Sequence, residues 1–404
     1  MKIVVLKFGG TSVGSAERIK NVAKIVTSYL KKKFKVIVVS SAMGGETNRL
    51  INLSKEISSN FTSSEYDTLV AAGEQISCSL IAGRLNDQGH LSRSWLSWQI
   101  PILTTGNYSY SKIESIYKKI IINFLKKGGV PVIAGFQGIN SENRVTTLGR
   151  GGSDASAIMI AKFFKAEKCI IYTDVDGVYT TDPNVVPKAK KIKKISYEEM
   201  LEMASLGAKV MQPNSIQDAR LNRIDIEVRS SFKNKAGSLI TKRKNISTKN
   251  IIRGVSFTKN DAKITLVGVK DRPGVAAKIF EPLFKNSINV DMVVQNISSY
   301  KKETDLTFTI KNEDLLKTEK LIKKNKKIIF KKLIIDERVS KVSIVGVGMI
   351  ATPGVTYRMF NALAKKNINI QVISTSEIKI SVLVERKNLK KAVDVLHKEF
   401  KLDY

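Results

Sequence analysis

The sequence has few of the side chains on which many catalytic sites depend. Its 404 residues include two histidines, His90 and His397, and neither lies in a motif typical of catalysis. Acid–base chemistry by histidine is therefore not expected. The two cysteines, Cys78 and Cys169, lie far apart and without the spacing of metal ligands. We expect neither structural disulfides nor a zinc site, and we predict no metal-binding side chains.

Long apolar runs are also missing. No window approaches the ~18 consecutive apolar residues of a membrane-spanning helix. The apolar start of the chain is interrupted by Lys7 and by Gly9-Gly10, which is not the layout of a signal peptide. We therefore expect a reduced, cytoplasmic protein without a membrane partner.

Acidic residues are scarce beside basic ones, with 36 Asp and Glu against 68 Lys and Arg and a net charge of +32. The lysine clusters are spread along the whole chain, at 31–33, 118–119, 190–194 and 323–327, and aromatic residues are not interleaved with them. A nucleic-acid-binding surface would combine such charge with a recognisable motif. We interpret the clusters as solvated faces and expect no nucleic-acid partner.

Residues 1–240 alternate buried strands with amphipathic helices. In 15–33, for example, apolar residues recur at helical spacing on one face. This alternation predicts an α/β domain with a mostly parallel sheet between two layers of helices, in which ligands bind beyond the carboxyl ends of the strands. The predicted strands cover 1–6, 35–40, 130–134 and 168–173. Polar or glycine residues lie at the carboxyl ends of these strands, at Lys7, Ser40-Ser41, Gly135 and Thr173-Asp174.

The segment Lys7-Phe8-Gly9-Gly10-Thr11-Ser12-Val13 comes directly after the first strand. Two adjacent glycines allow backbone N–H groups to approach an anion, and the lysine adds a full positive charge. The chain contains no Gly-Lys-Ser or Gly-Lys-Thr, so a P-loop is excluded. We predict a phosphate site of a different kind, although the motif alone could also be a tight turn between strand and helix.

A second motif, Leu148-Gly149-Arg150-Gly151-Gly152-Ser153-Asp154, precedes an apolar helix over 155–164. Arginine offers a planar pair of donors suited to a carboxylate, and the glycines let the backbone approach a ligand. An N-cap would explain Ser153 or Asp154, but it would not explain the preceding Arg-Gly-Gly. The motif therefore indicates a binding site.

Four other segments have weaker signals. Residues 40–47 and 135–138 follow buried strands and could be simple turns. Glu74, in 71–74, would by itself be a surface charge on a helix. The acidic loop 173–183 could hold a nucleotide, but its Asp-Gly and Asp-Pro pairs also form turns.

The C-terminal part contains an internal repeat. Val-Gly-Val recurs at 267 and 345 and Pro-Gly-Val at 273 and 353, so the second copy has two extra residues in its first loop. The sequence of each copy predicts the order strand, turn, helix, strand, strand and helix, which is the order of a ferredoxin-like fold. The first copy ends with a strand near 328–335. The second copy has no room for its last strand, and we expect 251–257 to supply it, so that the two copies interlock.

Taken in order, KFGGTSV, SSAMG, AAGE, GFQG, LGRGGSD, TDVDGVYTTDP and GAKVMQP resemble the aspartate kinases of the amino acid kinase family over the whole length. The repeat is similar to their paired ACT domains. Kinases of glutamate, acetylglutamate, carbamate or UMP share the glycine loop, but LGRGGSD followed by two ACT-like copies is specific to the aspartate enzymes. Ala155-Ser156-Ala157 departs from the Thr-Thr-Ala of that family.

The resemblance implies a three-layer kinase domain over 1–240, a linker and strand over 241–262, and ferredoxin-like ACT domains over 263–337 and 338–404. It implies transfer of the γ-phosphoryl group of ATP, with Mg²⁺, to the side-chain carboxylate of L-aspartate. The product, 4-phospho-L-aspartate, leads to lysine, threonine and methionine.

The resemblance also implies roles for individual residues. The catalytic residues are Lys7, which stabilises the moving phosphoryl group, and Asp154, which orients Lys7 or the magnesium. ATP would contact Lys7, Phe8, Gly9, Gly10, Thr173, Asp174, Tyr179, Asp182, Lys209 and Val210. Aspartate would contact Ser41, Thr47, Glu74, Arg150, Gly151, Gly152 and Ser153, with Arg150 on a carboxylate and Glu74 on the ammonium. An amino-acid effector would contact Asp271, Pro273, Gly274, Val275, Ala276, Asn289, Val290, Asp291 and Gln295.

The resemblance also implies two kinds of partner. Lysine, threonine or both would bind as regulatory effectors, and a second copy of the chain would form a homodimer through the ACT domains. Three alternatives stay open from sequence alone. One or both ACT-like copies could serve only for dimerisation. The enzyme could act on another acid, such as glutamate. A nucleic-acid-binding regulator that senses an amino acid would leave the glycine motifs without a purpose.

Overall fold

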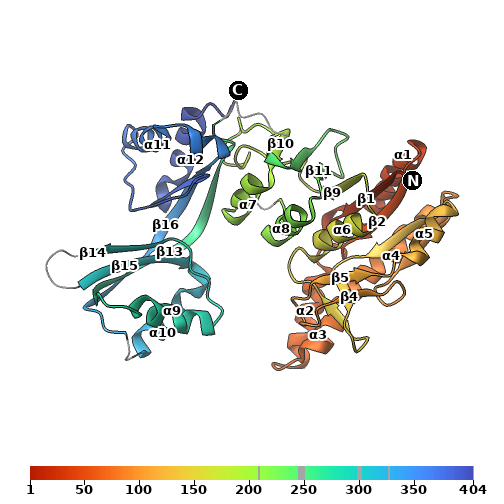
Figure 1. Cartoon of the computed structure of the whole chain (residues 1–404), viewed down its shortest axis with the longest axis horizontal. Helices are drawn as coiled ribbons and strands as arrows, with labels where there is room; N and C mark the ends of the chain where they lie inside the picture. The colour runs from red at the N-terminus through yellow and green to blue at the C-terminus, as the bar shows by residue number, and fades with distance from the viewer. Residues whose placement is uncertain (208–209, 244–250, 298–302, 326–327, 404) are drawn as a thin grey trace. The chain divides into compact units, whose positions relative to one another are not determined.

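The computed structural model describes residues 1–207, 210–243, 251–297, 303–325 and 328–403, and it contains two compact units (Figure 1). Unit 1 comprises Met1–Val178, Lys191–Ser205 and Lys209–Ile246, and unit 2 comprises Tyr179–Lys190, Leu206–Ala208 and Ser247–Tyr404. Among the described residues, no helix is long and apolar enough to cross a membrane. Both units mix helices and strands, as the sequence predicts.

Unit 1 is built around an eight-stranded sheet with the order β10-β12-β11-β9-β1-β2-β6-β3. All neighbours are parallel except β11 and β12. Its strands are β1 (Ile3–Phe8), β2 (Lys35–Ser40), β3 (Ser92–Trp95), β6 (Val130–Ala134), β9 (Lys168–Thr173), β10 (Lys194–Ser196), β11 (Ile226–Ser230) and β12 (Ser238–Thr241). The central strands are buried on both faces, which explains their continuous apolar sequences.

Helices cover both faces of this sheet. On one face, Val4, Leu6 and Phe8 of β1 share a core with α1 (Ala16–Lys31) and α4 (Ala72–Asp87). On the other face, α6 (Gly152–Phe163) packs on β1 and beside α8 (Pro213–Asn222). The remaining helices of the unit are α2 (Glu46–Ile57), α3 (Ser63–Val70), α5 (Lys119–Lys126) and α7 (Tyr197–Ser205). The predicted three-layer αβα architecture is confirmed.

A second, four-stranded sheet in unit 1 was not predicted from the sequence. Its order is β5-β4-β7-β8, with β4 (Ile102–Thr104), β5 (Ile113–Ile116), β7 (Gln137–Ile139) and β8 (Val145–Thr147). The strands β7 and β8 follow the Gly135 turn and precede the LGRGGSD motif, and they pair antiparallel. This sheet therefore determines how the motif enters α6.

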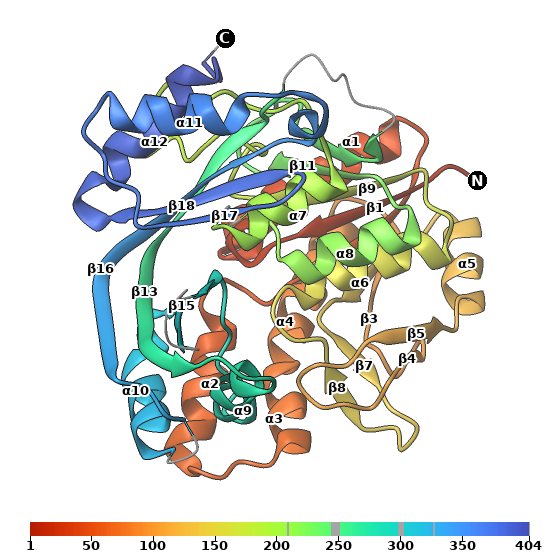
Figure 2. The same cartoon turned by 60° about the vertical axis from the view of Figure 1, so that its left-hand side comes forward.

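Unit 2 contains a continuous six-stranded sheet with the order β14-β15-β13-β16-β18-β17. Two long antiparallel strands, β13 (Gly254–Lys270) and β16 (Lys332–Val345), run through both copies of the repeat, as Figure 2 shows. The shorter strands are β14 (Val293–Ile297), β15 (Glu303–Lys311), β17 (Val372–Thr375) and β18 (Lys379–Glu385). The helices are α9 (Val275–Lys285), α10 (Leu315–Lys324), α11 (Val355–Ala364) and α12 (Leu389–Glu399).

The two copies have the same local geometry at their Pro-Gly turns. Gly274 and Gly354 both adopt left-handed backbone angles, with φ of 85° and 86°, and each caps the helix that follows. The two extra residues of the second copy fall in a short 3₁₀ segment, Val347–Ala351. The first part of β13, Gly254–Thr258, pairs with Lys341–Val345 of β16, so the pairing expected for the strand before the repeat is found.

The segment Tyr179–Lys190 departs from the expected boundary of a kinase domain at residue 240. It is grouped with unit 2 because its Val186 lies in the core of the second copy, beside Ile252 and Val255. The Val255 N–H also donates a hydrogen bond of 2.7 Å to the Thr180 carbonyl. Sequence alone gives no sign of this packing, because the segment lies between two strands of unit 1.

Candidate active site

Lys7 and Asp154 form a buried ion pair with a distance of 2.5 Å between Nζ and Oδ1. Because side chains alternate along a strand, Lys7 points to the face opposite Leu6 and Phe8, which is the face covered by α6. Asp154 lies in the first turn of α6, so the helix brings its carboxylate under the end of β1. Both residues are 8% exposed. The structure thus brings together the two residues predicted to be catalytic.

The glycines after β1 allow close contact with the loop after β2. A Cβ on Gly10 would lie 2.9 Å from the Ala42 carbonyl, and the Gly44 N–H donates to the Gly10 carbonyl at 3.0 Å. The Gly9 N–H donates to the Tyr172 carbonyl at 3.0 Å. This hydrogen bond differs from the expectation that both glycine amides are available for phosphate, because the Gly9 amide extends the pairing of β1 with β9.

Glu74 is buried in the first turn of α4, and the simpler interpretation as a surface charge is wrong. Its Oε1 accepts the Ala42 N–H at 3.0 Å, whereas Oε2 is buried without a hydrogen-bond partner among the described residues. Burial raises the pKa of Glu74 from 4.5 to about 8, against the opposing effects of the Ala42 amide and the Lys7 charge. A buried acceptor without a partner suits a cationic ligand group.

The other residues expected to bind aspartate lie in three segments, namely the loop after β2, helix α2 and the turn into α6. Ser41 follows β2, and its carbonyl accepts a hydrogen bond of 2.6 Å from the Ser77 hydroxyl of α4. Ser153 lies against the Gly135 turn, where a Cβ on Gly135 would be 2.9 Å from Ser153 Cβ. Thr47 is half-buried in α2, and Arg150 is exposed at the turn before α6. Ser41 and Ser153 thus lie near the ends of β2 and β6, while Arg150 is accessible to a ligand.

The loop Leu148–Gly152 is held by contacts with its neighbours. Gly151 has a φ of 77°, and a Cβ there would lie 2.7 Å from Gln212 of the segment before α8. Gly152 packs on Phe136, where a Cβ would again come within 2.7 Å. The glycines of the motif are therefore required for close packing as well as for any approach to a ligand.

Asp67 organises the same loop and was not identified from the sequence. It is fully buried in α3, and its carboxylate accepts hydrogen bonds from the backbone and hydroxyl groups of Thr147 and Ser109, at 2.7–3.0 Å. Its pairing with Thr147 fixes the strand that leads into the motif. An acidic residue in an amphipathic helix carries no signal of such a role, so only the tertiary structure reveals it.

Of the predicted nucleotide residues, Thr173 ends β9 and Asp174 follows it, both in unit 1, while Tyr179 and Asp182 belong to unit 2. The Thr173 carbonyl accepts the Ser231 N–H at 3.0 Å, and Ser231 Oγ lies 2.8 Å from Ser12 Oγ of the first motif. Asp182 Oδ1 accepts the Asn184 N–H at 2.9 Å, a turn contact. Val210 is half-buried, and Lys209 lies outside the described residues.

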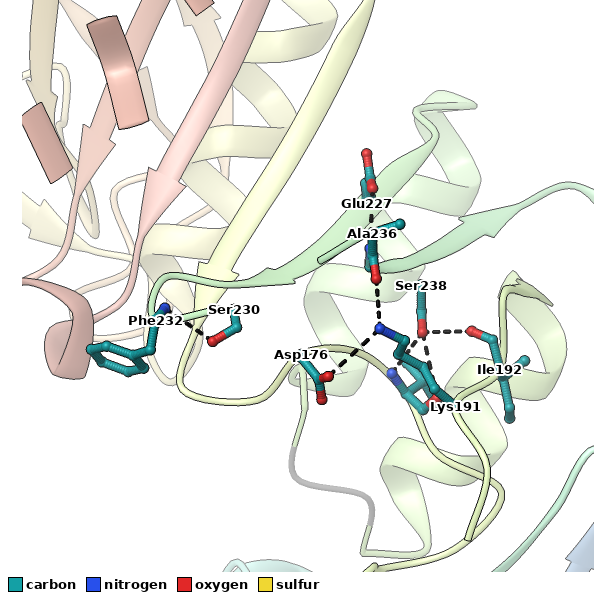
Figure 3. A network of polar contacts seen from close by, with 10 residues as sticks. Asp176, Lys191, Ile192, Glu227, Ser230, Phe232, Ala236 and Ser238 are labelled. Atoms are coloured by element: carbon teal, nitrogen blue, oxygen red, sulfur yellow. Dashed lines mark hydrogen bonds and ion pairs between the residues drawn. The ribbon is translucent and has the colours of Figure 1, made fainter. Parts of the chain in front are cut away.

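A polar network fixes the loops beyond β9 and β11 (Figure 3). Lys191 Nζ donates to the Ala236 carbonyl at 2.6 Å and lies 3.6 Å from Asp176 Oδ2. Ser238 Oγ accepts the Val178 N–H at 2.8 Å and donates to the Ile192 carbonyl at 2.6 Å. The acidic loop is thus tied to the end of the sheet in unit 1. Lys191 and Ser238 were not identified from the sequence, where neither belongs to a motif.

The predicted effector residues lie at the turn and start of α9, in the segment before β14, and in β14 itself, which contains Gln295. Asp271, Pro273 and Gly274 are exposed, and Val275 and Ala276 begin the helix. Asn289, Asp291 and Gln295 are exposed, and Val290 is half-buried. Asp291 already has an ionic partner, because it pairs with the buried Lys341 of β16. An effector ammonium would therefore share Asp291 with Lys341.

The arrangement suits phosphoryl transfer more than acid–base catalysis. A buried lysine with a carboxylate partner faces the carboxyl end of a parallel sheet, where glycine-rich turns from β1, β2 and β6 meet. Among the described residues, no group of three or more His, Cys, Asp or Glu side chains is placed to hold a metal ion. Mg²⁺ that arrives with a nucleotide usually needs only one or two protein carboxylates.

Comparison with known proteins gives consistent matches. The model of the amino acid kinase family matches residues 2–230, and an ACT domain model matches 264–325 and 342–400. An aspartate kinase of Pseudomonas putida is 46% identical over 405 residues, covering 100% of this chain and 98% of that protein. An aspartokinase of Helicobacter pylori is 46% identical over 405 residues, covering 99% of this chain and 100% of that protein.

Two crystal structures of E. coli aspartokinase III have similar folds. The complex with aspartate and ADP (R-state) has a TM-score of 0.79 and 25% identity, covering 98% of this chain and 99% of that one. The complex with lysine and aspartate (T-state) has a TM-score of 0.82 and 26% identity, covering 99% and 100%. The family models, the relatives and the solved structures all point to the same family. The chain therefore belongs to the amino acid kinase family and, within it, to the aspartate kinases.

Proposed function

We propose that the chain transfers the γ-phosphoryl group of ATP to the side-chain carboxylate of L-aspartate and forms 4-phospho-L-aspartate and ADP. The observation that carries this proposal is the buried Lys7–Asp154 pair at the ends of parallel strands, close to the buried Glu74. The E. coli relative was crystallised with aspartate and ADP, which supports these two ligands.

The reaction needs no general base. The aspartate side chain is ionised at neutral pH, so its oxygen attacks the γ-phosphorus directly while the bond to the β-phosphate oxygen breaks and ADP leaves. Lys7 stabilises the negative charge on the moving phosphoryl group, and Asp154 holds the Lys7 ammonium in place. Mg²⁺ bound with the nucleotide would add further positive charge, with Asp154 as the protein carboxylate that faces it.

Substrate recognition needs opposite charges at the two ends of the amino acid. The free Oε2 of Glu74 would accept the aspartate ammonium, which would favour the ionised carboxylate despite burial. Arg150, exposed at the glycine turn, would bind a substrate carboxylate with its paired donors. The hydroxyl groups of Ser41, Thr47 and Ser153 would complete the site.

The two copies of the repeat are proposed to be ACT domains at 263–337 and 338–404, with 241–262 adding a strand to the second. We propose that lysine, threonine or both bind at the Gly274 turn and reduce activity, and that the ACT domains form a dimer. The E. coli relative was crystallised with lysine, which supports such an effector. The N-terminus of α9 would receive the effector carboxylate.

The test is ATP turnover with aspartate, with hydroxylamine present to trap the acyl phosphate and with lysine or threonine added in separate reactions. We expect an aspartate hydroxamate whose formation is reduced by one or both amino acids at millimolar concentration. Hydroxamate from glutamate but not from aspartate would overturn the substrate. Unchanged rates with both amino acids would overturn the regulatory proposal alone.

A further inference from the structure

The chain between β6 and β7 is held on both sides of Phe136 by close packing at a glycine. A Cβ on Gly135 would lie 2.9 Å from Ser153 Cβ, and a Cβ on Gly138 would overlap Thr104 Cγ2. Neither glycine has a left-handed backbone, so both serve to let the backbone approach its neighbours. The change of chain direction after β6 therefore falls on Phe136.

Phe136 adopts the left-handed conformation, with a φ of 68°. This region is unfavourable for a bulky side chain, and a residue such as phenylalanine stays in it only where its surroundings impose it. The Phe136 N–H donates to Ser156 Oγ at 3.0 Å, and the Leu148 N–H donates to the Phe136 carbonyl at 3.0 Å. The Ser156 hydroxyl is thus one of the two groups that hold the strained residue by its backbone.

Phe136 contacts α6 before and after Asp154. Its ring packs on Gly152, where a Cβ would lie 2.7 Å from Phe136 Cδ2, and its N–H is bonded to Ser156, one turn further along the helix. Asp154 lies midway between these two positions in the sequence and pairs with Lys7 at 2.5 Å. A change in the conformation of Phe136 would therefore move the helical turn that carries Asp154.

A buried serine often does no more than satisfy one backbone group, and Ser156 is 1% exposed. Two observations argue for a further role. The N–H that it accepts belongs to a residue in an unfavourable conformation, and such residues cluster at active sites. The helical turn that Phe136 holds carries one member of the ion pair to which phosphoryl transfer is assigned. Ser156 is thus linked to this pair through Phe136.

We propose that Ser156 is a positioning residue for phosphoryl transfer. Its hydroxyl holds Phe136 in the left-handed conformation, and Phe136 in turn sets the first turn of α6 so that Asp154 meets Lys7. The inference rests on the proposed role of the Lys7–Asp154 pair, and it assigns Ser156 no contact with either substrate. All of these residues belong to unit 1.

The first test is the steady-state kinetics of Ser156→Ala and Ser156→Thr. Ser156→Ala leaves the Phe136 N–H without its acceptor, so the strained conformation should relax and kcat should fall about 5- to 20-fold. KM for ATP and KM for aspartate should stay within about threefold of the wild type, because the lost effect lies in the transition state. Ser156→Thr keeps the hydroxyl group and should recover kcat to within about twofold.

Ser196→Ala is the matched control. Ser196 is as buried as Ser156, and its hydroxyl also accepts a backbone N–H, that of Glu199 at 3.1 Å. It lies in β10, at the edge of the sheet and four strands from β1. Ser196→Ala should lower the melting temperature and leave kcat unchanged. A normal kcat in Ser156→Ala, or the same loss of kcat in Ser196→Ala, would overturn the positioning role.

Phe136→Gly tests whether Ser156 acts through the backbone of residue 136. Glycine adopts the left-handed conformation without support, so adding Ser156→Ala to Phe136→Gly should lower kcat by less than about twofold. An undiminished effect of Ser156→Ala in the double variant would show that Ser156 acts by another route, and it would overturn the inference. If Phe136→Gly does not fold, the comparison of Ser156→Ala with Ser156→Thr and Ser196→Ala decides.

Amide hydrogen exchange needs no substrate and separates this inference from the proposed function. Exchange of 135–139 and 148–154 should be faster in Ser156→Ala than in the wild type and unchanged in Ser196→Ala. Unchanged exchange in Ser156→Ala, or faster exchange with a normal kcat, would overturn the inference and leave aspartate phosphorylation intact. Hydroxamate from glutamate but not from aspartate would overturn the proposed acceptor alone, and the variants would then be compared with glutamate.

Discussion

At the scale of single residues, the site keeps two opposite charges out of water. Burying the Lys7 ammonium and the Asp154 carboxylate costs more than a surface pair would, and such a pair is often no more stabilising than apolar residues of the same size. Its value lies in the fixed position of the ammonium group. A lysine held by a buried partner needs no reorganisation when negative charge develops on a phosphoryl group.

Lys7→Ala should therefore lower kcat by ~10²–10³ or more, since it removes a donor to the transition state. Turnover in the hydroxamate assay measures the effect. Lys2→Ala, which changes an exposed lysine just before β1, is the matched control and should be near normal. Near-normal turnover of Lys7→Ala would exclude the catalytic assignment.

The pH dependence of aspartate binding should follow Glu74. Its pKa is raised to about 8 by burial, so the carboxyl group is mostly protonated at pH 6.5 and must lose a proton before it can accept an ammonium group. Aspartate affinity should then increase with pH, and KM for aspartate should fall by up to about tenfold per unit until pH 8 and level off above it.

Glu74→Gln should have a raised KM for aspartate that no longer changes between pH 6.5 and 8.5, with KM for ATP nearly unchanged. The measurement is KM for each substrate across this range in both proteins. The same pH slope in Glu74→Gln as in the wild type would assign the titration to another group.

Single residues show where sequence-based prediction was sufficient and where it was not. Lys7 and Asp154 could be predicted because each lies in a motif whose glycines are unusual. Burial of Glu74 could not be predicted from its position in a helix, because it depends on the loop after β2, whose Ala42 N–H donates to the Glu74 carboxylate only in the folded chain. Asp67 was missed for the same reason.

At the scale of elements, α4 packs closely on the loop after β2 at Gly73 but has open space beside Gly83. A Cβ on Gly73 would lie 2.7 Å from Ala42 Cβ, so any larger residue must push the helix away from the loop after β2. A Cβ on Gly83, in the same helix, would meet nothing within 4 Å. The helix is thus packed tightly at the end that carries Glu74.

Gly73→Ala should destabilise the protein by about 1–3 kcal/mol through overpacking and raise KM for aspartate, because Glu74 moves with the helix. Gly83→Ala should leave kinetics unchanged and stabilise by about 0.5–1 kcal/mol, since alanine favours the helix. Thermal unfolding and KM for both variants provide the comparison. Equal behaviour of the two variants would contradict the close packing at Gly73.

The elements that could be predicted from the sequence are the strands that are buried on both faces. The predicted strands 35–40, 130–134 and 168–173 coincide with β2, β6 and β9, because parallel strands buried on both faces have continuous apolar sequences. The four-stranded sheet was missed because its strands have only three or four residues. Such short segments carry too few residues for a period to be recognised.

At the scale of the whole molecule, the two copies of the repeat share β13 and β16. Pairing continues through both copies, with irregular register between Thr258 and Lys263. Each copy keeps its own apolar core on this common sheet. Because the strands are shared, we expect local unfolding of one copy to be accompanied by local unfolding of the other.

Ile264→Ala, in the core of the first copy, should cost about 2–5 kcal/mol. Amide hydrogen exchange should then accelerate in β18 of the second copy as well as in β15 of the first. Val38→Ala, in the core of unit 1, should leave both strands unaffected. Faster exchange in β15 alone would show that the copies open independently.

The internal repeat could be predicted from the sequence, because Val-Gly-Val and Pro-Gly-Val recur at nearly constant spacing. The packing of Tyr179–Lys190 within unit 2 could not be predicted. Its sequence reads as a turn-rich connection between two strands, and its packing depends on Val186 and Thr180 meeting residues about 70 to 220 positions later in the chain.

The shared strand β13 has a consequence for synthesis of the chain. Its first part, Gly254–Thr258, leaves the ribosome well before its partner Lys341–Val345 and before α12, which completes the core of the second copy. Until β16 has emerged, this part of the strand has an open edge that could pair with another nascent chain. Folding of unit 2 therefore has to wait until α12 has been synthesised, and its yield should depend on how well that edge is shielded in the meantime.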